Sequence, residues 1–379
     1  MELDALREKI DAVDETMLAL FIERMELSGQ VAAYKREHAL PLLNKTRERE
    51  ILARVTQNAG ELEPYVHQFF TNLFELSKAR QAELNAGASR IRALIEQALA
   101  APEVVFPHTG VIACQGIEGS NSQAAADKLF PRGNIVYVKS FEAAFNAVES
   151  GLCQFAVLPI ENSTNGSVRA VYNLLQKKRF SIVRGTSLCI RHELMAKPGT
   201  KTADITEIFS HEQALGQCGL WLATLSGKVK ITPCANTALA AKMVAESADP
   251  GAAAICSHAC AELYGLETLS GDIQDSDNNY TRFICVTKKP AIYAGANRIS
   301  LILACQNKPG ALNEILTKLA AHGVNMSKLE SCPVTGGNFE FEFFMELDAS
   351  VREPGVLPLL EELERISESF LFLGNYSMV

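Results

Sequence analysis

Residues 280–283 read Tyr-Thr-Arg-Phe, and residues 309–312 read Pro-Gly-Ala-Leu. The first stretch ends a long region in which strand-like and helix-like patterns alternate. The second follows an apolar, strand-like run and places a glycine at the start of a helical pattern. The interval between them, around residues 290–297, therefore marks a border between domains. A chain of 379 residues is long enough for two or three such domains.

The composition is that of an ordinary globular protein, with 47% apolar and 21% charged residues. A net charge of −8 argues against a nucleic-acid-binding protein, which would carry a basic surface. No run approaches the roughly 20 apolar residues of a membrane helix, and the N-terminus lacks the pattern of a secretory signal. The ten cysteines are scattered without a Cys-x-x-Cys pair, which favours reduced thiols in the cytoplasm and predicts no metal site.

The last 80 residues predict a βαββαβ order, which is the ferredoxin-like arrangement. The expected elements are strands at 299–305, 324–332, 338–347 and 369–375 and helices at 310–321 and 354–366.

The middle of the chain predicts a two-lobed α/β domain with a cleft, similar in outline to a periplasmic binding protein. Strands are expected at 111–114, 135–138, 155–160 and 182–189, and helices at 122–130, 141–149 and 168–177. Strands that alternate with helices favour a mainly parallel sheet.

The first 85 residues predict helices only. Apolar residues recur at three- and four-residue steps from Leu3 onward, and the first helix is expected to run about 35 residues, or roughly 50 Å. Further helices are expected at 44–57 and 64–84, with another helical piece at 91–99. So long a first helix indicates a partner chain. The predicted domains are 1–86 (all-helical), 109–290 (α/β) and 297–379 (βαββαβ), with a linker at 87–108.

Polar groups in the helical region recur on shared helix faces. Arg24 and Lys35 are 11 residues apart, which returns them to within about 20° on one helix face, about 16 Å apart. The same spacing argument applies to Asn44, Arg47 and Glu48 on the second helix, and to Ser77 and Gln81 on the third. These groups could line one pocket, or they could be solvated surface residues.

This region resembles the all-helical chorismate mutases. The resemblance rests on residues 6–11 (Leu-Arg-Glu-Lys-Ile-Asp), 23–24 (Glu-Arg), Lys35 and 47–50 (Arg-Glu-Arg-Glu). That family rearranges chorismate to prephenate by orientation and electrostatics, without a cofactor. The resemblance implies that Arg7, Arg24 and Arg47 hold the substrate carboxylates and that Lys35 and Gln81 donate to the ether oxygen. It also implies that Glu48 binds the ring hydroxyl, while Asn44 and Ser77 complete the pocket.

Arg7 and Arg24 are 17 residues apart, about 25 Å along one helix and on different faces. They cannot reach one small substrate from the same straight helix. If both act, Arg7 comes from a second chain, and the protein is a homodimer or a larger homo-oligomer.

Two strand-to-helix turns in the middle region carry Gly, Ser and Asn. They lie at residues 116–122 (Gly-Ile-Glu-Gly-Ser-Asn-Ser) and 162–167 (Asn-Ser-Thr-Asn-Gly-Ser). Such turns leave backbone N–H groups for an anion, although Ser and Asn are also ordinary helix caps.

Together with 159–163 (Pro-Ile-Glu-Asn-Ser), 210–213 (Ser-His-Glu-Gln), 217–218 (Gln-Cys) and 281–283 (Thr-Arg-Phe), these turns resemble the prephenate dehydratase family. The resemblance places Thr281 near the leaving hydroxyl and assigns substrate binding to Asn162, Ser163, Gln217 and Arg282. Asn121 stands where relatives often have an aromatic residue. His211 is either an acid or a structural hydrogen-bonding residue.

The C-terminal region resembles an ACT domain, the module that senses free amino acids. Its motifs are 309–312 (Pro-Gly-Ala-Leu) and 330–333 (Glu-Ser-Cys-Pro), with Cys332 where relatives carry Arg. The resemblance implies a phenylalanine site formed by Gly310, Ala311, Leu312, Glu330 and Ser331, usually between two ACT domains.

As a whole the chain resembles bifunctional enzymes that join a chorismate mutase to a prephenate dehydratase. This implies conversion of chorismate through prephenate to phenylpyruvate under phenylalanine control. The alternatives are an arogenate dehydratase, and a non-catalytic amino-acid sensor built on the two-lobed domain.

Overall fold

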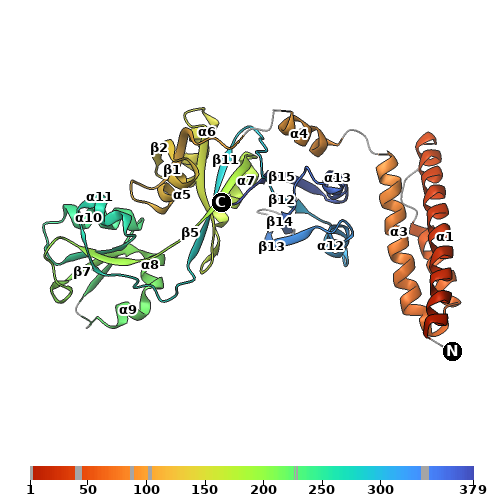
Figure 1. Cartoon of the computed structure of the whole chain (residues 1–379), viewed down its shortest axis with the longest axis horizontal. Coiled ribbons are helices and arrows are strands. Elements are labelled where there is room, and N and C mark those ends of the chain that lie inside the picture. Colours follow the sequence, from red (N-terminus) through yellow and green to blue (C-terminus); the bar gives the residue numbers. More distant parts are fainter. Residues whose placement is uncertain are drawn as a thin grey trace. The chain divides into compact units, whose positions relative to one another are not determined.

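The computed structural model describes residues 3–38, 45–85, 89–100, 105–225, 227, 229–333 and 341–379. The chain divides into two compact units, Met1–Ala93 and Leu94–Val379. Figure 1 colours the first unit red to orange and the second orange to blue.

The first unit is all-helical, as predicted. Its elements are α1 (Leu3–Glu37), α2 (Lys45–Gln57), the 3₁₀ turn η1 (Gly60–Leu62) and α3 (Glu63–Asn85). Both α1 and α2 pack against α3 (Figure 1). The buried positions along this contact include Ala32 on α1 and Leu73, Phe74 and Ser77 on α3. A fourth helix, α4 (Arg90–Leu99), follows.

The second unit begins with the first lobe of the α/β region. Its sheet has the order β2-β1-β3-β11-β5, with β4 paired to β3. The strands are β1 (Thr109–Gln115), β2 (Arg132–Val138), β3 (Phe155–Asn162), β4 (Gly166–Ser167), β5 (Ser181–Cys189) and β11 (Tyr280–Thr287). The helices are α5 (Asn121–Leu129), α6 (Phe141–Glu149) and α7 (Arg169–Lys178).

The second lobe has a sheet of order β10-β6-β9-β7-β8. Its strands are β6 (Glu193–Ala196), β7 (Glu207–His211), β8 (Lys230–Cys234), β9 (Ala252–Cys256) and β10 (Glu267–Ser270). Its helices are η2 (Thr202–Asp204), α8 (Glu212–Gln217), α9 (Gly219–Ala223), α10 (Thr237–Glu246) and α11 (Ala259–Tyr264). The two-lobed architecture is confirmed.

Along the main path of each sheet four strands run in one direction, as predicted, but one strand runs against them, so both sheets are mixed. In the first sheet β11 runs antiparallel to both β3 and β5, and in the second β6 runs antiparallel to both β9 and β10. These are the two strands by which the chain enters each lobe from the other one. A strand that arrives by such a crossover is not bound by the right-handed βαβ connection that keeps neighbouring strands parallel.

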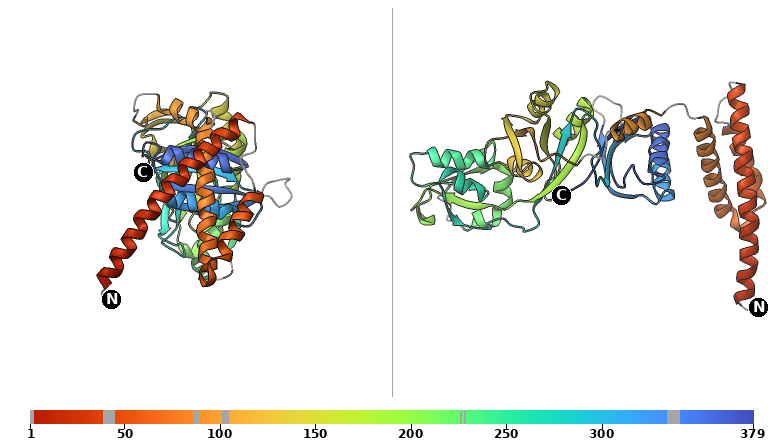
Figure 2. Two further views of the ribbon diagram at one scale, coloured as in Figure 1. Left: turned by 90° about the vertical axis from the view of Figure 1, so that its right-hand side faces the viewer. Right: turned by 45° about the horizontal axis from the view of Figure 1, so that its top comes forward.

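The C-terminal region has the predicted βαββαβ order. Its sheet, ordered β13-β14-β12-β15, is antiparallel throughout, and both helices lie on one face of it (Figure 2). The elements are β12 (Arg298–Ala304), α12 (Ala311–Ala321), β13 (Asn325–Pro333), β14 (Phe341–Asp348), α13 (Val356–Ile366) and β15 (Ser369–Tyr376).

The C-terminal sheet shares a hydrophobic core with the first lobe. Phe344 and Tyr376 are buried in the same hydrophobic cluster as Tyr172. The rings of Tyr172 and Phe344 pack edge to face, with 4.4 Å between their centroids. At Gly374 an added Cβ would lie 2.1 Å from the carbonyl oxygen of Ile182, so only glycine lets β15 approach β5 this closely. The two parts therefore pack as one body.

Candidate functional site

A cavity of about 510 Å³ is lined by both lobes of the α/β region and by Ile190 and His192 in the connection from β5 to β6. The first lobe contributes the ends of β1, β3 and β11 and the N-terminus of α5. The second contributes α8 and the turn before α10. Of the residues predicted to bind substrate or act in catalysis, Thr281, Asn162 and Gln217 line this cavity.

Thr281 and Asn162 lie opposite each other on the neighbouring strands β11 and β3. The amide nitrogen of Asn162 donates to the Thr281 hydroxyl over 2.9 Å. The Asn162 side-chain oxygen accepts from the backbone N–H groups of Thr164 (3.0 Å) and Asn165 (2.9 Å), which fixes the amide. Because the Thr281 oxygen already accepts, its own hydrogen is left to donate to a ligand.

A chain of hydrogen bonds continues from Asn162 across the cleft. The Asn162 amide nitrogen also donates to Asn279 Oδ1 (2.9 Å), and Asn279 Nδ2 donates to Gln217 Oε1 (3.0 Å). Nε2 of His192 lies 2.9 Å from the same Gln217 oxygen. Asn279 and His192 are 2% and 3% exposed. The chain thus joins Thr281 in the first lobe to Gln217 in the second.

Sequence reasoning missed Asn279 and His192. Both lie in connections between regular elements, where a polar residue is usually solvated. The one feature of the sequence that could have indicated a role for Asn279 is its position two residues before Thr281.

The predicted anion-binding turns also reach the cavity. Gly116, Ser120, Asn121 and Ser122 line it at the N-terminus of α5, where first-turn N–H groups have no intrahelical partner. Ser120 is the helix cap as well, since its hydroxyl accepts from Gln123 N–H over 3.4 Å.

His211 lines the cavity and caps α8. Its Nδ1 accepts from the backbone N–H of Gln213 over 3.2 Å. The structural hydrogen-bonding role, one of the two predicted for His211, is thus present.

Ser163 and Arg282, both predicted to bind substrate, lie outside the cavity lining. The Ser163 hydroxyl donates to Asn278 O (2.8 Å) and accepts from Tyr280 N–H (2.9 Å), so it fixes the loop that leads to Thr281. Side chains alternate along a strand, so Arg282 leaves the sheet on the face opposite Thr281.

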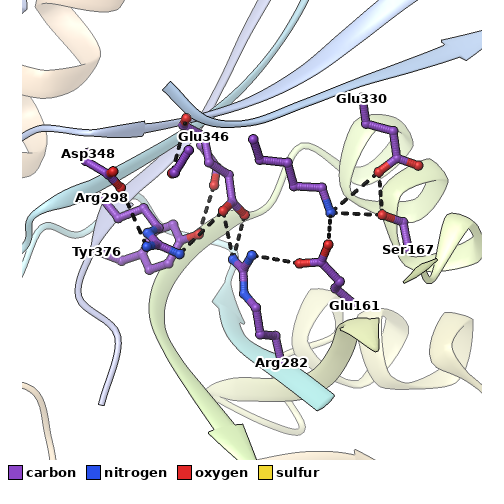
Figure 3. Close-up of polar contacts among 11 residues, drawn as sticks. Glu161, Ser167, Arg282, Arg298, Glu330, Glu346, Asp348 and Tyr376 are labelled. Atoms are coloured by element: carbon purple, nitrogen blue, oxygen red, sulfur yellow. Dashed lines mark hydrogen bonds and ion pairs between the residues drawn. The ribbon is translucent and has the colours of Figure 1, made fainter. Parts of the chain in front are cut away.

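On that face Arg282 contacts the C-terminal sheet (Figure 3). Its guanidinium donates to Glu161 (2.8 Å) and twice to Glu346 on β14 (2.7 and 2.9 Å). Arg298 approaches the same Glu346 carboxylate at 3.5 Å. Glu346 is 1% exposed, so this is a buried ion pair.

Lys328 on β13 makes a second set of contacts with the first lobe. Its ammonium lies 2.7 Å from Glu161 and 2.9 Å from the Ser167 hydroxyl, and it is 3.5 Å from Glu330 on its own strand. Ser167 also donates to Glu330 (Figure 3). Burial alone would raise the pKa of Glu161, but the hydrogen bond and charge of Lys328, with the charge of Arg282, lower it overall. Ser167 lines the cavity and Glu161 precedes Asn162, so β13 contacts residues at the rim of the cleft.

The residues predicted to bind an effector divide between two places. Gly310 caps α12 with φ +86°, and space around it is open where a Cβ would stand. Ala311 is buried and Leu312 is half-buried behind it. Glu330 instead contacts Ser167 and Lys328, and Ser331, on the opposite face of β13, is exposed.

In the helical unit, Arg24 and Ser77 come together between α1 and α3. The guanidinium donates to the Ser77 hydroxyl and to Leu73 O (3.4 Å), and lies over the Phe74 ring at 5.7 Å. Glu48 reaches α3 through Lys78, at 3.8 Å.

The other predicted mutase residues are more dispersed. Arg7 is exposed and pairs with Asp4 (3.2 Å), and Arg47 is exposed and pairs with Glu50 (3.2 Å). Lys35 and Gln81 are half-buried on α1 and α3. Asn44 lies outside the described residues.

No helix in the described part of the chain has the length and apolar character needed to cross a membrane. Within the same residues, no group of three or more His, Cys, Asp and Glu side chains is placed to hold a metal ion.

Three family profiles match the sequence. The one described as chorismate mutase type II covers residues 6–82, the one described as prephenate dehydratase covers 112–291, and the one described as ACT domain covers 299–367.

The bifunctional chorismate mutase/prephenate dehydratase of Escherichia coli (strain K12) is 34% identical over 380 residues, which covers 98% of this chain and 95% of the relative. Arogenate dehydratase/prephenate dehydratase 2, chloroplastic, of Arabidopsis thaliana is 36% identical over 277 residues, covering 70% and 72%. The solved structure of prephenate dehydratase from Arthrobacter aurescens in complex with L-Phe is 31% identical, with a TM-score of 0.65, and covers 70% of this chain and 89% of that one. The chain therefore belongs to the family of bifunctional chorismate mutase/prephenate dehydratases.

Proposed function

We propose that the chain rearranges chorismate to prephenate in its helical unit and converts prephenate to phenylpyruvate in the cleft of the α/β domain. Phenylalanine, the amino acid corresponding to that product, binds the ACT domain and inhibits. The observation that carries the proposal is the chain of hydrogen bonds along the cleft that joins Thr281, Asn162, Asn279 and Gln217. It lies in a sequence that matches a bifunctional relative over 98% of its length.

In the dehydratase reaction, the bond to the ring carboxylate breaks as carbon dioxide leaves, and its electron pair enters the ring. The ring hydroxyl departs in the same step with the electrons of its C–O bond, takes up a proton from solvent to become water, and leaves an aromatic product. The Thr281 hydroxyl donates a hydrogen bond to the departing oxygen, while Gln217 and the N-terminus of α5 bind carboxylate or keto oxygens. A threonine hydroxyl is a weak acid, so Thr281 positions and stabilises rather than protonates outright.

Ser163 and Arg282 support this site from outside the cavity. Ser163 fixes the loop at residues 278–280. Arg282 on β11 binds Glu346 in the C-terminal sheet, which is the sheet of the ACT domain and is called the ACT sheet below. Their direct contact with substrate remains a prediction.

In the mutase reaction no group is transferred to the protein. The ether C–O bond breaks as a C–C bond forms, so catalysis consists of orientation and of stabilising negative charge on the ether oxygen. Arg24, held by Ser77, supplies a carboxylate-binding guanidinium. Arg47 binds the other carboxylate, and Lys35 and Gln81 donate to the ether oxygen. Glu48 binds the ring hydroxyl, and Asn44 completes the pocket.

The mutase unit is proposed to be a dimer in which Arg7 of one chain completes the pocket of the other. In one copy of the chain, α1 leaves large apolar side chains exposed along most of its length, far more than a soluble monomer normally shows. They are Leu3, Leu6, Ile10, Val13, Met17, Leu18, Leu20, Phe21, Ile22, Leu27, Val31 and Tyr34. Light scattering tests this, since an active monomeric mutase unit would contradict it.

Phenylalanine control is supported by the L-Phe complex of the Arthrobacter aurescens relative and by the open turn at Gly310. Gly310, Ala311 and Leu312 would hold the amino acid. Glu330 and Ser331 on β13 would also bind the amino acid. Glu330 would link the effector site to the dehydratase domain through its contacts with Ser167 and Lys328.

The proposed domains are residues 1–86, 109–290 and 297–379, and the proposed location is the cytoplasm. A second candidate activity is arogenate dehydratase, favoured by the name of the Arabidopsis thaliana relative. Arogenate carries an amine where prephenate has a keto group.

The experiment incubates the purified chain separately with chorismate, prephenate and arogenate, with and without phenylalanine, and follows the products by chromatography. The proposal predicts phenylpyruvate from chorismate and from prephenate, less of it when phenylalanine is present. Faster turnover of arogenate than of prephenate would favour the second activity. If none of the three compounds is consumed, the chain is not this enzyme and the sensor alternative stands.

A further inference from the structure

His192 lies where the two crossovers between the lobes meet. It follows β5 and precedes β6 in the first crossover. Its backbone N–H donates to Oε1 of Gln274 over 3.0 Å, and its carbonyl accepts from Ile273 N–H over 3.0 Å. Residues 273 and 274 belong to the second crossover, so the backbone of His192 is hydrogen-bonded to the other connection at both its N–H and its carbonyl group.

The contacts of its ring determine which nitrogen carries the proton. Gln217 Oε1 accepts from Asn279 and lies 2.9 Å from His192 Nε2. An amide oxygen has no hydrogen to give, so Nε2 must be the donor. Nδ1 is buried and has no hydrogen-bond partner in the described part of the chain.

A proton on Nδ1 would place an unpaired N–H and a charge inside the protein. Burial accordingly lowers the pKa of His192, while the bond to Gln217 acts in the opposite direction. The ring is therefore neutral, with its hydrogen on Nε2.

This arrangement decides what Gln217 offers to a ligand. Its oxygen is occupied by two donors, and its amide nitrogen has no partner among the described residues. Oxygen and nitrogen of a glutamine amide are nearly the same size, so hydrogen bonds alone select the orientation. If the amide turned over, it would present oxygen to an anionic substrate and repel it.

We propose that His192 is a positioning residue of the dehydratase site, whose Nε2–H group holds the Gln217 amide so that its nitrogen donates to a carboxylate or keto oxygen of the substrate. This inference rests on the proposed dehydratase function. His192 acts through Gln217 and transfers no proton itself.

Two substitutions separate this role from a structural one. His192→Gln places an amide N–H close to the position of Nε2, whereas His192→Leu fills much of the space without a donor. With prephenate, His192→Leu should raise KM roughly 10- to 30-fold with a smaller change in kcat, and His192→Gln should stay within about threefold of the unmodified chain.

A double-mutant cycle gives the decisive comparison. In a Gln217→Met background, adding His192→Leu should cause no further loss of kcat/KM, because the group through which His192 acts is already gone. An equal loss in both backgrounds would overturn the proposal, and so would a His192→Gln variant as impaired as His192→Leu. Urea unfolding of each variant identifies any that are inactive because they do not fold.

A second measurement does not depend on turnover. In ¹⁵N-histidine-labelled full-length chain, the His192 signals are assigned by their loss in His192→Gln. We expect the neutral Nε2–H tautomer at pH 7, and an Nδ1–H tautomer or a charged ring would overturn the inference. If the unmodified chain leaves prephenate unchanged, the proposed function fails, while the tautomer still decides whether His192 orients Gln217.

Discussion

Replacing Glu346 by Gln tests how the ACT sheet is held to the dehydratase lobe. The Glu346 carboxylate is 1% exposed and accepts two hydrogen bonds from Arg282, at 2.7 and 2.9 Å. Removing one partner of a buried ion pair costs about 3–5 kcal/mol, because the remaining charge stays buried. Arg282 keeps its 2.8 Å bond to Glu161, so we expect a loss of about 3 kcal/mol in the free energy of unfolding, at the lower end of that range.

The assay is urea unfolding of the full-length chain at pH 7, followed by circular dichroism and by the fluorescence of Trp221, the single tryptophan. The matched control is Asp348→Asn, on the same strand. Asp348 is 39% exposed at its side chain and lies 3.5 Å from Arg298, so its loss should cost under about 1 kcal/mol. If Glu346→Gln destabilises the chain no more than Asp348→Asn does, the Arg282–Glu346 pair does not hold the two domains together.

Three further predictions follow from the two sites and from the contacts of Glu161. Thr281→Val should lower kcat with prephenate roughly 100-fold, because it removes a preorganised hydrogen-bond donor. Thr281→Ser keeps a hydroxyl and should retain most of the rate. Steady-state kinetics of both variants checks this. Arg24→Leu should lower kcat/KM with chorismate roughly 10- to 100-fold and leave prephenate turnover unchanged, and a parallel loss of both activities would contradict independent sites. The pKa of Glu161 is lowered in the folded chain. The ionised Glu161 therefore stabilises the fold above the ordinary carboxyl pKa, and this stabilisation is lost as pH falls through the lowered pKa. Glu161→Gln should reduce the drop in the urea midpoint between pH 7 and acid pH.

The regular elements could be predicted from the sequence because local periodicity determines them. The 35-residue α1 and the βαββαβ order both follow from apolar spacing that neighbouring residues carry on their own. Strand direction does not follow from it. That β11 runs against β3 and β5 depends on the route of the chain between lobes, which no local pattern records.

Only those cleft residues that belong to local sequence motifs could be predicted. Thr281, Asn162 and Gln217 belong to family motifs and line the cavity. His192 and Asn279 belong to connecting segments, and only the tertiary structure buries them. Arg282 follows Thr281 directly, but the alternation of side chains along β11 directs it to the ACT sheet instead of the cleft.

The most direct test of two active sites in one chain is a time course with chorismate, comparing the unmodified chain with Thr281→Val. The account predicts that the unmodified chain yields phenylpyruvate, whereas Thr281→Val consumes chorismate at the same rate and accumulates prephenate. Phenylpyruvate formed by Thr281→Val at the unmodified rate would contradict the placement of the dehydratase site in the cleft. Loss of chorismate consumption in a folded variant would contradict the separation of the two sites.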